Sequence, residues 1–330
     1  MRNRGTLRLA RRRLLAGVAL SPGLAWAQPS WPGGRAVTMV VAFPPGGQAD
    51  VSARPTAAAM ERALGVAVPV VNRAGAAGAL GNAFVARAPG DGHTLLMALS
   101  SVLILPEADR IHARPPQYEV EQLAPIARIT NDPTVLVVAG DSPWRTLEDF
   151  IADARRRPGA ISYSSSGHFG ALHVPMVMLS AAANIELLHV PFQGGGPALT
   201  ALLSGTVQAL ASGTGPVMQH IQSGRLRALA SSAPTRQPNL PDVPTFAERG
   251  LTGVEYAIWA GVFAPASTPA PLREQIRQAV ARAAQDADTG RALNTAGSPL
   301  AYLDGEAFAR FVAEDQARLV AVARRIGRVE

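Results

Sequence analysis

The chain contains no cysteine and no lysine, and both absences exclude whole classes of chemistry. Without cysteine there is no disulfide, no thiolate nucleophile and no cysteine metal ligand. All 31 basic residues are arginine, which excludes a P-loop lysine, a Schiff-base lysine and a lysine general base. No serine has the flanking glycines of the G-x-S-x-G nucleophile elbow. The composition therefore gives little support to an enzyme.

Charge of either sign is also scarce. The formal net charge is +7, but the first 27 residues hold no acid and six arginines, namely Arg2, Arg4, Arg8, Arg11, Arg12 and Arg13. The 25 remaining arginines stand against 24 acidic residues, a net charge of +1. Such a balance predicts no basic surface for nucleic acid or for an anionic membrane, so neither is expected as a partner.

The first 27 residues have the three parts of an export signal. A basic stretch ends at Arg13, a short apolar run covers 14–24, and Ala25–Trp26–Ala27 is a small-x-small cleavage pattern. Arg11–Leu15 also resembles a twin-arginine signal, so both the Tat and the Sec route are open. The run is too short to stay as a membrane-spanning helix. We expect a periplasmic protein, cleaved near Ala27.

Beyond this signal, apolar strand candidates alternate with helical stretches, which predicts an α/β protein with largely parallel sheets. Strands are expected at 37–43, 68–72, 93–99, 126–130, 135–139, 161–164, 186–190 and 207–211, with helices at 51–64, 76–88, 146–156, 172–182 and 197–204. Helical spacing of apolar residues predicts that the C-terminal third is helical. A length of 330 residues favours two domains.

Glycine-rich turns follow two of these strands, at equivalent places in the two halves of the chain. One is Phe43–Asp50 and the other is Ser164–Gly170. Backbone N–H groups at a helix N-terminus attract anions, so two such turns facing across a cleft would hold an anion without a basic side chain. Asp50 lies in a first helical turn, where capping is its expected role and ligand contact its second.

Two further segments bear on this cleft. His189–Leu199 repeats the strand, glycine turn and helix, and three such turns converge at the carboxyl edge of one sheet. Asn72–Gly81 is spaced G-x-x-G-x-x-G, and no acid follows about 20 residues later, which argues against dinucleotide binding. We interpret it as close packing beside the cleft.

The six histidines lack the spacing of a zinc-binding helix, and four of them are scattered along the chain. His173 and His189 are interpreted as hydrogen-bonded structural residues, and His168 as a candidate for lining a pocket. No metal and no cofactor are expected.

Several short segments occur in a specific order along the chain. They are Pro44–Asp50, Asn72–Gly78, Pro89–Leu95, Ser165–Gly167, His173, His189–Phe192, Leu226–Ala230, Leu240–Thr245 and Trp259–Pro265. In this order they resemble Bug-type solute receptors of the tripartite tricarboxylate transporter family, over nearly the whole mature chain.

The resemblance implies a two-lobed type II periplasmic-binding-protein (Venus-flytrap) fold of the α/β class, with a hinge between the lobes. Residues 28–130 would begin the first lobe, 131–235 would form the second, and 236–330 would return to the first. It implies a monomeric, non-enzymatic receptor that delivers a small carboxylate to two integral-membrane permease subunits. A ligand-presenting sensor is an alternative. An exported hydrolase is another, and it would need His168 with one of Ser164–Ser166 and no evident acid.

In such receptors, backbone groups and ordered waters of these turns hold the ligand carboxylate. The matching positions here are Phe43, Pro45, Gly46, Gly47, Gln48, Asp50, Ser100, Ser165, Ser166, Gly167, His168, Gly170, Gln193, Gly194, Gly195 and Thr214. Gly170–Ala171 replaces a hydroxyl-bearing pair, Phe192–Gln193 replaces Tyr–Lys, and Gly213–Gly215 lies where many relatives carry Asp. The second-lobe side is thus less polar, and the identity of the carboxylate stays open.

Overall fold

The computed structural model describes residues 31–328, so the export signal expected at residues 1–27 lies outside the described residues. The strands are β1 (Thr38–Val41), β2 (Val70–Asn72), β3 (Thr94–Leu99), β4 (Leu123–Ala139), β5 (Ser162–Ser165), β6 (Leu188–Pro191), β7 (Ala209–Gly213), β8 (Leu226–Ser231), β9 (Ala257–Pro265) and β10 (Leu300–Asp304). The helices are α1 (Gln48–Leu64), α2 (Ala79–Ala86), α3 (Leu105–Ile111), α4 (Leu147–Arg156), α5 (Val174–Ala183), α6 (Gly195–Leu203), α7 (Thr214–Gln222), α8 (Ala270–Gln285), α9 (Ala287–Thr295) and α10 (Gly305–Ile326).

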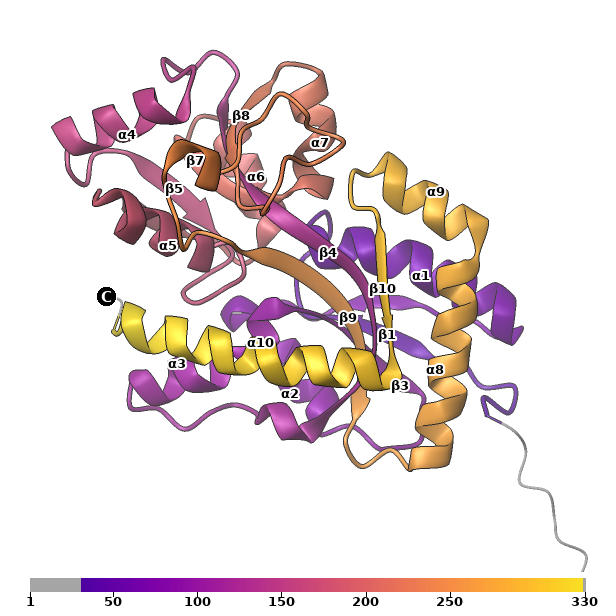
Figure 1. Cartoon of the computed structure of the whole chain (residues 1–330). Helices are drawn as coiled ribbons and strands as arrows, with labels where there is room; N and C mark the ends of the chain where they lie inside the picture. Colours follow the sequence, from indigo (N-terminus) through magenta and orange to yellow (C-terminus); the bar gives the residue numbers. More distant parts are fainter. Residues whose placement is uncertain (1–30, 329–330) are drawn as a thin grey trace, which may run out of the picture. The chain divides into compact units, whose positions relative to one another are not determined.

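Strand β4 joins the two lobes of residues 31–328. Its first part pairs with β9 and β10 in the sheet that also holds β1, β2 and β3, which we call the first lobe. Its last part, from Thr134, pairs with β7 and β8 in the sheet that also holds β5 and β6, the second lobe. Figure 1 shows β4 and β9 running side by side between the lobes.

Three expectations about the strands need correction. The segments 126–130 and 135–139 are parts of one strand, because Asn131, Asp132 and Pro133 pair with β9 instead of breaking the ladder. The sheets are mixed, since β9 and β4 pair with their neighbours antiparallel. The C-terminal third also contains β9 and β10. Strand β9 is a continuous apolar run, buried on both faces, which periodicity alone does not distinguish from a buried helix.

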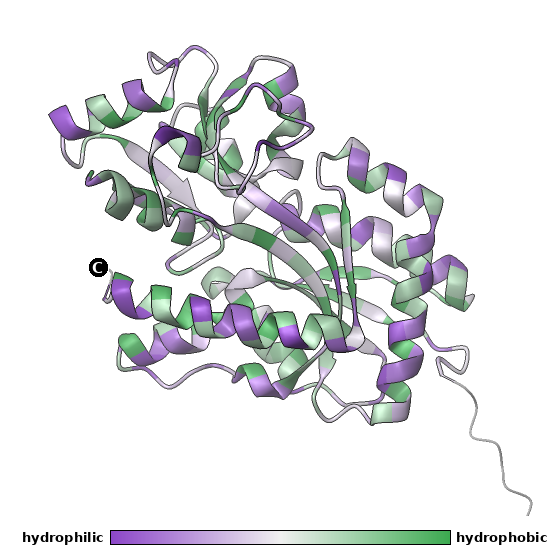
Figure 2. Ribbon diagram, in the orientation of Figure 1, coloured by the Kyte–Doolittle hydropathy of each residue, from purple (hydrophilic) through white to green (hydrophobic). Residues whose placement is uncertain are grey.

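The apolar side chains form two buried clusters. One lies within the second lobe and includes Trp144, Phe150, Phe246 and Val254. The other fills the first lobe and continues into the second through residues such as Leu172. Figure 2 shows the matching pattern, with hydrophobic strands inside and hydrophilic stripes on the outer faces of helices such as α8 and α10. The lobes of residues 31–328 therefore pack against each other in a closed arrangement.

Glycines in the segment 72–81 let α2 approach β1 closely. A Cβ on Gly81 would lie 2.7 Å from the Cα of Ala42 and from the carbonyl oxygen of Arg73. A Cβ on Gly78 would lie 2.8 Å from the ring of Phe43. These distances leave no room for side chains, which agrees with the packing role expected for this segment. Among residues 31–328, no helix has the length and apolar character needed to cross a membrane.

Candidate functional site

The first wall of the site is the turn between β1 and α1. Gly46 has φ +83°, a conformation that glycine adopts without steric cost. Gly47 is extended (φ −91°, ψ 175°) and precedes the first residue of α1, Gln48. The first N–H groups of a helix have no partner within the helix. The start of α1 therefore presents backbone donors at the end of β1.

Asp50 fixes the shape of this turn. Its carboxylate accepts from the Gly46 N–H at 3.2 Å, from Arg54 Nε at 2.8 Å and from Asn72 Nδ2 at 3.1 Å. Burial alone would raise the pKa of Asp50, but the hydrogen bonds from Arg54, Asn72 and Gly46 together hold it below its ordinary value. Asp50 is thus ionised and holds the turn before α1 through the N–H of Gly46, but its carboxylate accepts from no N–H of α1 itself, so the expected capping of this helix is not seen.

The opposite wall begins with the N-terminus of α6. A Cβ on Gly47 would lie 3.5 Å from the backbone nitrogen of Gly196 and 3.7 Å from the Cα of Gly195. A Cβ on Gly196 would lie 2.5 Å from the carbonyl oxygen of Pro45, and one on Gly194 would lie 2.5 Å from Pro44. The glycine turns of the two lobes therefore meet backbone to backbone.

The turn Ser165–Gly167 forms the next part of this wall. Ser165 Oγ accepts from the Gly167 N–H at 3.1 Å and lies 2.6 Å from His189 Nε2. Ser166 Oγ accepts from the Leu172 N–H at 3.4 Å. Helix α5 begins only at Val174, after Phe169 at φ +56°, so this turn does not open directly onto a helix as expected. The second-lobe helix that faces Gly47 is α6.

A small cavity lies between these walls. It is lined by residues of both lobes: Phe43, Gly47, Gln48, Ala49, Leu99, Ser166, Leu172, Gly195, Ser212 and Pro216. The volume of this cavity that is open to water is about 20 Å³, close to the space that one water molecule requires. Ser212 and Pro216 flank the start of α7. The N-termini of α1, α6 and α7 therefore converge on one cavity, and no charged side chain lines it.

A second, wider recess also has walls from both lobes. Its volume is about 570 Å³, and its lining includes Ala77, Arg114, His168, Phe192 and Gln193. The expected site residues His168 and Gln193 line this recess and not the small cavity.

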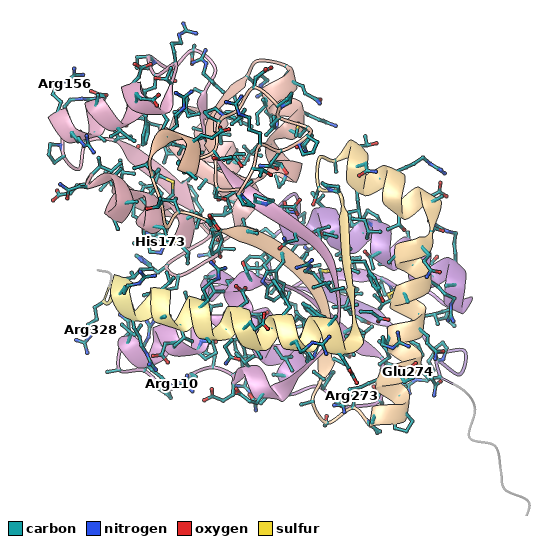
Figure 3. All side chains as sticks on the ribbon, viewed as in Figure 1. Arg110, Arg156, His173, Arg273, Glu274 and Arg328 are labelled. Atoms are coloured by element: carbon teal, nitrogen blue, oxygen red, sulfur yellow. The ribbon has the colours of Figure 1, made fainter. Side chains whose placement is uncertain are left out.

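Three histidines converge beneath the Ser165–Gly167 turn, which the scattered positions in the sequence did not predict. Each of His168, His173 and His189 has a nitrogen within 4.8 Å of one on the other two. Figure 3 labels His173, which lies directly before α5. Burial lowers the pKa of His173 to about 3 and that of His189 to about 4. Both imidazoles are therefore neutral at pH 7.

The hydrogen bonds of this cluster suit a structural role. The Phe169 N–H donates to His173 Nδ1 at 3.1 Å, so the ring proton of His173 is on Nε2. The protonated Nε2 of His173 has no lone pair to offer a metal ion, and the lone pair of its Nδ1 already accepts from the Phe169 N–H. His189 Nε2 is occupied by the Ser165 hydroxyl. His173 and His189 therefore have the hydrogen-bonded role expected of them, whereas the buried Nδ1 of His168 has no hydrogen-bond partner among residues 31–328.

Other expected residues take different positions. Ser100 and Thr214 do not line the small cavity. Ser100 Oγ instead forms a hydrogen bond with Tyr256 OH at 3.0 Å, and Thr214 Oγ1 donates to the Gly297 carbonyl at 2.7 Å. Sequence reasoning missed five lining residues: Ala49, Leu99, Leu172, Ser212 and Pro216. Leu99 and Ser212 could have been found, since each lies at the carboxyl end of a strand.

The chain is similar to a family of known proteins over most of its length. The model of the "Tripartite tricarboxylate transporter family receptor" matches residues 52–328. A Pseudomonas sp. (strain P51) protein in the tcbD-tcbE intergenic region is 38% identical over 295 residues, covering 88% of this chain and 86% of that protein. Protein BugT of Bordetella pertussis is 32% identical over 295 residues, covering 89% of this chain and 90% of BugT.

Solved structures are similar over the same range. The periplasmic binding protein BugD has a TM-score of 0.83 at 30% identity, covering 89% of this chain and 98% of BugD. MatC from Rhodopseudomonas palustris with bound malate has a TM-score of 0.81 at 29% identity, covering 88% of this chain and 99% of MatC. R. palustris Rpa4515 with adipate has a TM-score of 0.82 at 29% identity, covering 89% and 97%.

Proposed function

Because this chain belongs to the tripartite tricarboxylate transporter receptor family, we propose that it captures a small carboxylate in the periplasm and delivers it to a membrane permease. The family and the similar structures are solute-binding receptors and not enzymes. Delivery would involve a monomeric receptor and two integral-membrane permease subunits. Malate in MatC and adipate in Rpa4515 support a small carboxylate as the ligand here.

The observation that carries the proposal is the meeting of α1, α6 and α7 at one uncharged cavity. Their N-termini supply backbone donors and partial positive charge, which suits a carboxylate that arrives without a basic side chain to receive it. Gln48, Ser166 and Ser212 add side-chain polar groups to the same lining. Such a site suits reversible binding of an anion, and the contact between Ser165 Oγ and His189 Nε2 lies outside its lining.

Capture requires the lobes to separate, because the cavity holds little more than one water. We place the hinge where β4 passes from one sheet to the other, near residue 130. Phe246 and Val254 pack in the second-lobe cluster, so we place the return to the first lobe directly before β9, later than residue 236. In domain closure around a ligand, a few hinge residues absorb the change in backbone angles.

The test compares the mature protein, residues 28–330, with a Gly47→Val variant. Malate, adipate, succinate and benzoate would be screened by thermal shift, and those that stabilise the protein would be measured by calorimetry. The methyl groups that the substitution adds would push against Gly195 and Gly196. The extended backbone of Gly47 accepts valine, so the variant should fold and lose binding at least 100-fold.

Gly290→Val is the matched control, because a Cβ at Gly290 in α9 meets nothing within 4 Å. It should bind as the wild type does. Equal binding by folded Gly47→Val would place the ligand elsewhere, and no stabilisation by any carboxylate would reject the ligand class. Uptake by cells that carry the permease subunits tests the transport step separately.

A further inference from the structure

A buried polar cluster lies beside the cavity, where β4, α1 and the segment before β10 meet. The side chain of Asp132 is 1% exposed, that of Gln48 is 4% exposed, and that of Ser298 is fully buried. Gln48 Nε2 donates to Asp132 Oδ2 and, at 2.8 Å, to Ser298 Oγ. Ser298 Oγ donates to Asp132 Oδ2 at 2.6 Å. Every side chain bonded to this carboxylate is therefore neutral.

The other end of the Gln48 amide has no partner. Its Oε1 is buried and accepts no hydrogen bond from any of residues 31–328. A Cβ on Gly213 would lie 2.6 Å from this oxygen, so it points at the start of α7, where Ser212 and Pro216 line the cavity. An unpaired buried acceptor costs about 1–3 kcal/mol. The amide that carries this acceptor belongs to a residue that lines a cavity suited to an anion.

We infer that Asp132 takes up a proton when a carboxylate enters the cavity, and that the Gln48 amide then turns so that its NH₂ group donates to that carboxylate. This rests on the proposed receptor function. The amide oxygen and nitrogen have nearly the same shape, so turning the amide preserves the packing. Oε1 then accepts a hydrogen bond from the protonated Asp132 carboxyl, and Ser298 still donates to Asp132, while the hydrogen bond from Gln48 to Ser298 is given up. Nε2 takes the place of the unpaired oxygen. One proton from solvent balances the step, and no covalent bond in the protein or the ligand breaks.

The surroundings of Asp132 favour the neutral acid. Burial raises the pKa of Asp132 to about 7, against the hydrogen bonds from Ser298, Thr130 and Gln48 that lower it. The titratable groups on the elements packed around it include Asp50, Arg54, Glu61, Arg62, Arg128, His220, Tyr302, Asp304 and Asp315. Within residues 31–328, none of these is a hydrogen-bond or ion-pair partner of Asp132. No cation therefore holds the carboxylate in its charged form.

Asp132→Asn is the decisive variant, because its amide NH₂ permanently supplies the donor that protonated Asp132 would provide. Malate and adipate would be titrated by calorimetry between pH 6 and pH 8.5, in buffers of different ionisation enthalpy. In the wild type, affinity should fall by close to tenfold per pH unit above neutrality, and close to one proton should be taken up per ligand. The Asn variant should bind at pH 8.5 as the wild type does at pH 6, with no proton uptake.

Asp288→Asn, an exposed substitution on α9, is the control and should keep the pH dependence of the wild type. If malate binds with a pH-independent affinity in the wild type, the receptor function stands and this inference falls. If neither dicarboxylate binds, NMR of the ligand-free protein decides. The Gln48 side-chain amide signals should then shift with the ionisation of the Asp132 carboxyl. If the chemical shifts of the Gln48 amide do not change as the Asp132 carboxyl ionises, the inference is overturned.

Discussion

The two walls of the cavity are built differently. Apart from Leu99, the first-lobe wall comes from one continuous segment, Phe43 to Ala49, held by the Asp50 carboxylate with its arginine partner. The second-lobe wall is assembled from separate parts of the chain: Ser166 follows β5, Gly195 begins α6 and Ser212 lies at the end of β7. Behind it stand histidines that burial keeps neutral. Neither wall offers a free charge, so backbone donors at helix N-termini remain as the source of attraction for an anion.

The largest expected effect tests how closely the walls meet. A Cβ on Gly196 would lie 2.5 Å from the Pro45 carbonyl oxygen, whereas a Cβ on Gly47 would meet atoms at ordinary contact distance. Gly196→Ala should therefore weaken carboxylate binding at least 100-fold, about 2.7 kcal/mol. Gly47→Ala should change it by less than about threefold, or 0.7 kcal/mol. Calorimetry on both variants checks this, and equal effects of the two methyl groups would contradict the closed arrangement.

The difference between the walls also explains what sequence could predict. The strand, turn and helix of the first wall follow one another in the sequence, so the proline and glycine pattern alone predicts a turn between β1 and α1. The second wall depends on pairing between distant segments. His189 lies beside Tyr163 because β5 and β6 pair in parallel with a specific register. The sequence spacing of His168, His173 and His189 does not reveal the register in which β5 and β6 pair.

The role of Asp132 was hidden for a similar reason. Asn131–Asp132–Pro133 resembles a break between two strands, yet β9 pairs with all three residues and Asp132 is buried. The partners of Asp132, Gln48 and Ser298, are 84 and 166 residues away in the sequence. A carboxylate in such a place is identified only when tertiary contacts show that no arginine accompanies it.

The histidines should make the second wall sensitive to acid. His173 has a pKa of about 3 in the fold and about 6.5 when unfolded. Between pH 6.5 and pH 3, His173 is protonated in the unfolded chain but neutral in the folded chain. The free energy of unfolding therefore falls as the pH drops from 6.5 toward 3. From pH 7 to pH 5 this amounts to about 2 kcal/mol for His173, with His189 adding in the same direction.

Asp132 acts in the opposite sense, because its pKa is raised in the fold. Its proton stabilises the folded chain below pH 7, and this contribution is lost as the pH rises from about 4 to 7. Urea unfolding at pH 5 and pH 7 measures the balance. His173→Asn keeps an acceptor for the Phe169 N–H and should lose less stability on acidification than the wild type, while Asp132→Asn should lose more. Unchanged pH slopes in both variants would contradict this assignment.

A single hydroxyl on the second wall should have a smaller effect. Ser166 lines the cavity and is 2% exposed. Ser166→Ala should weaken carboxylate binding by about 1.5 kcal/mol, roughly tenfold, as expected for one hydrogen bond to a charged group. Thr206→Ala, outside the cavity lining, serves as the control in calorimetry. An affinity within twofold of the wild type would show that the Ser166 hydroxyl accepts from the Leu172 N–H but does not bind the ligand.

The smallest effect is expected on the first wall, from Asp50→Asn. The substitution removes the charge that Gly46, Asn72 and Arg54 share. Because the Arg54 side chain is 53% exposed, water replaces part of the lost ion pair. The expected loss is therefore about 1 kcal/mol of unfolding free energy at pH 7. The pKa of Asp50 is lowered in the fold, so its contribution is present above pH 4 and disappears as the pH falls below its folded pKa. Urea unfolding should show a wild-type advantage at pH 7 that shrinks toward pH 3, and an advantage independent of pH would mean that the charge of Asp50 does not hold the turn.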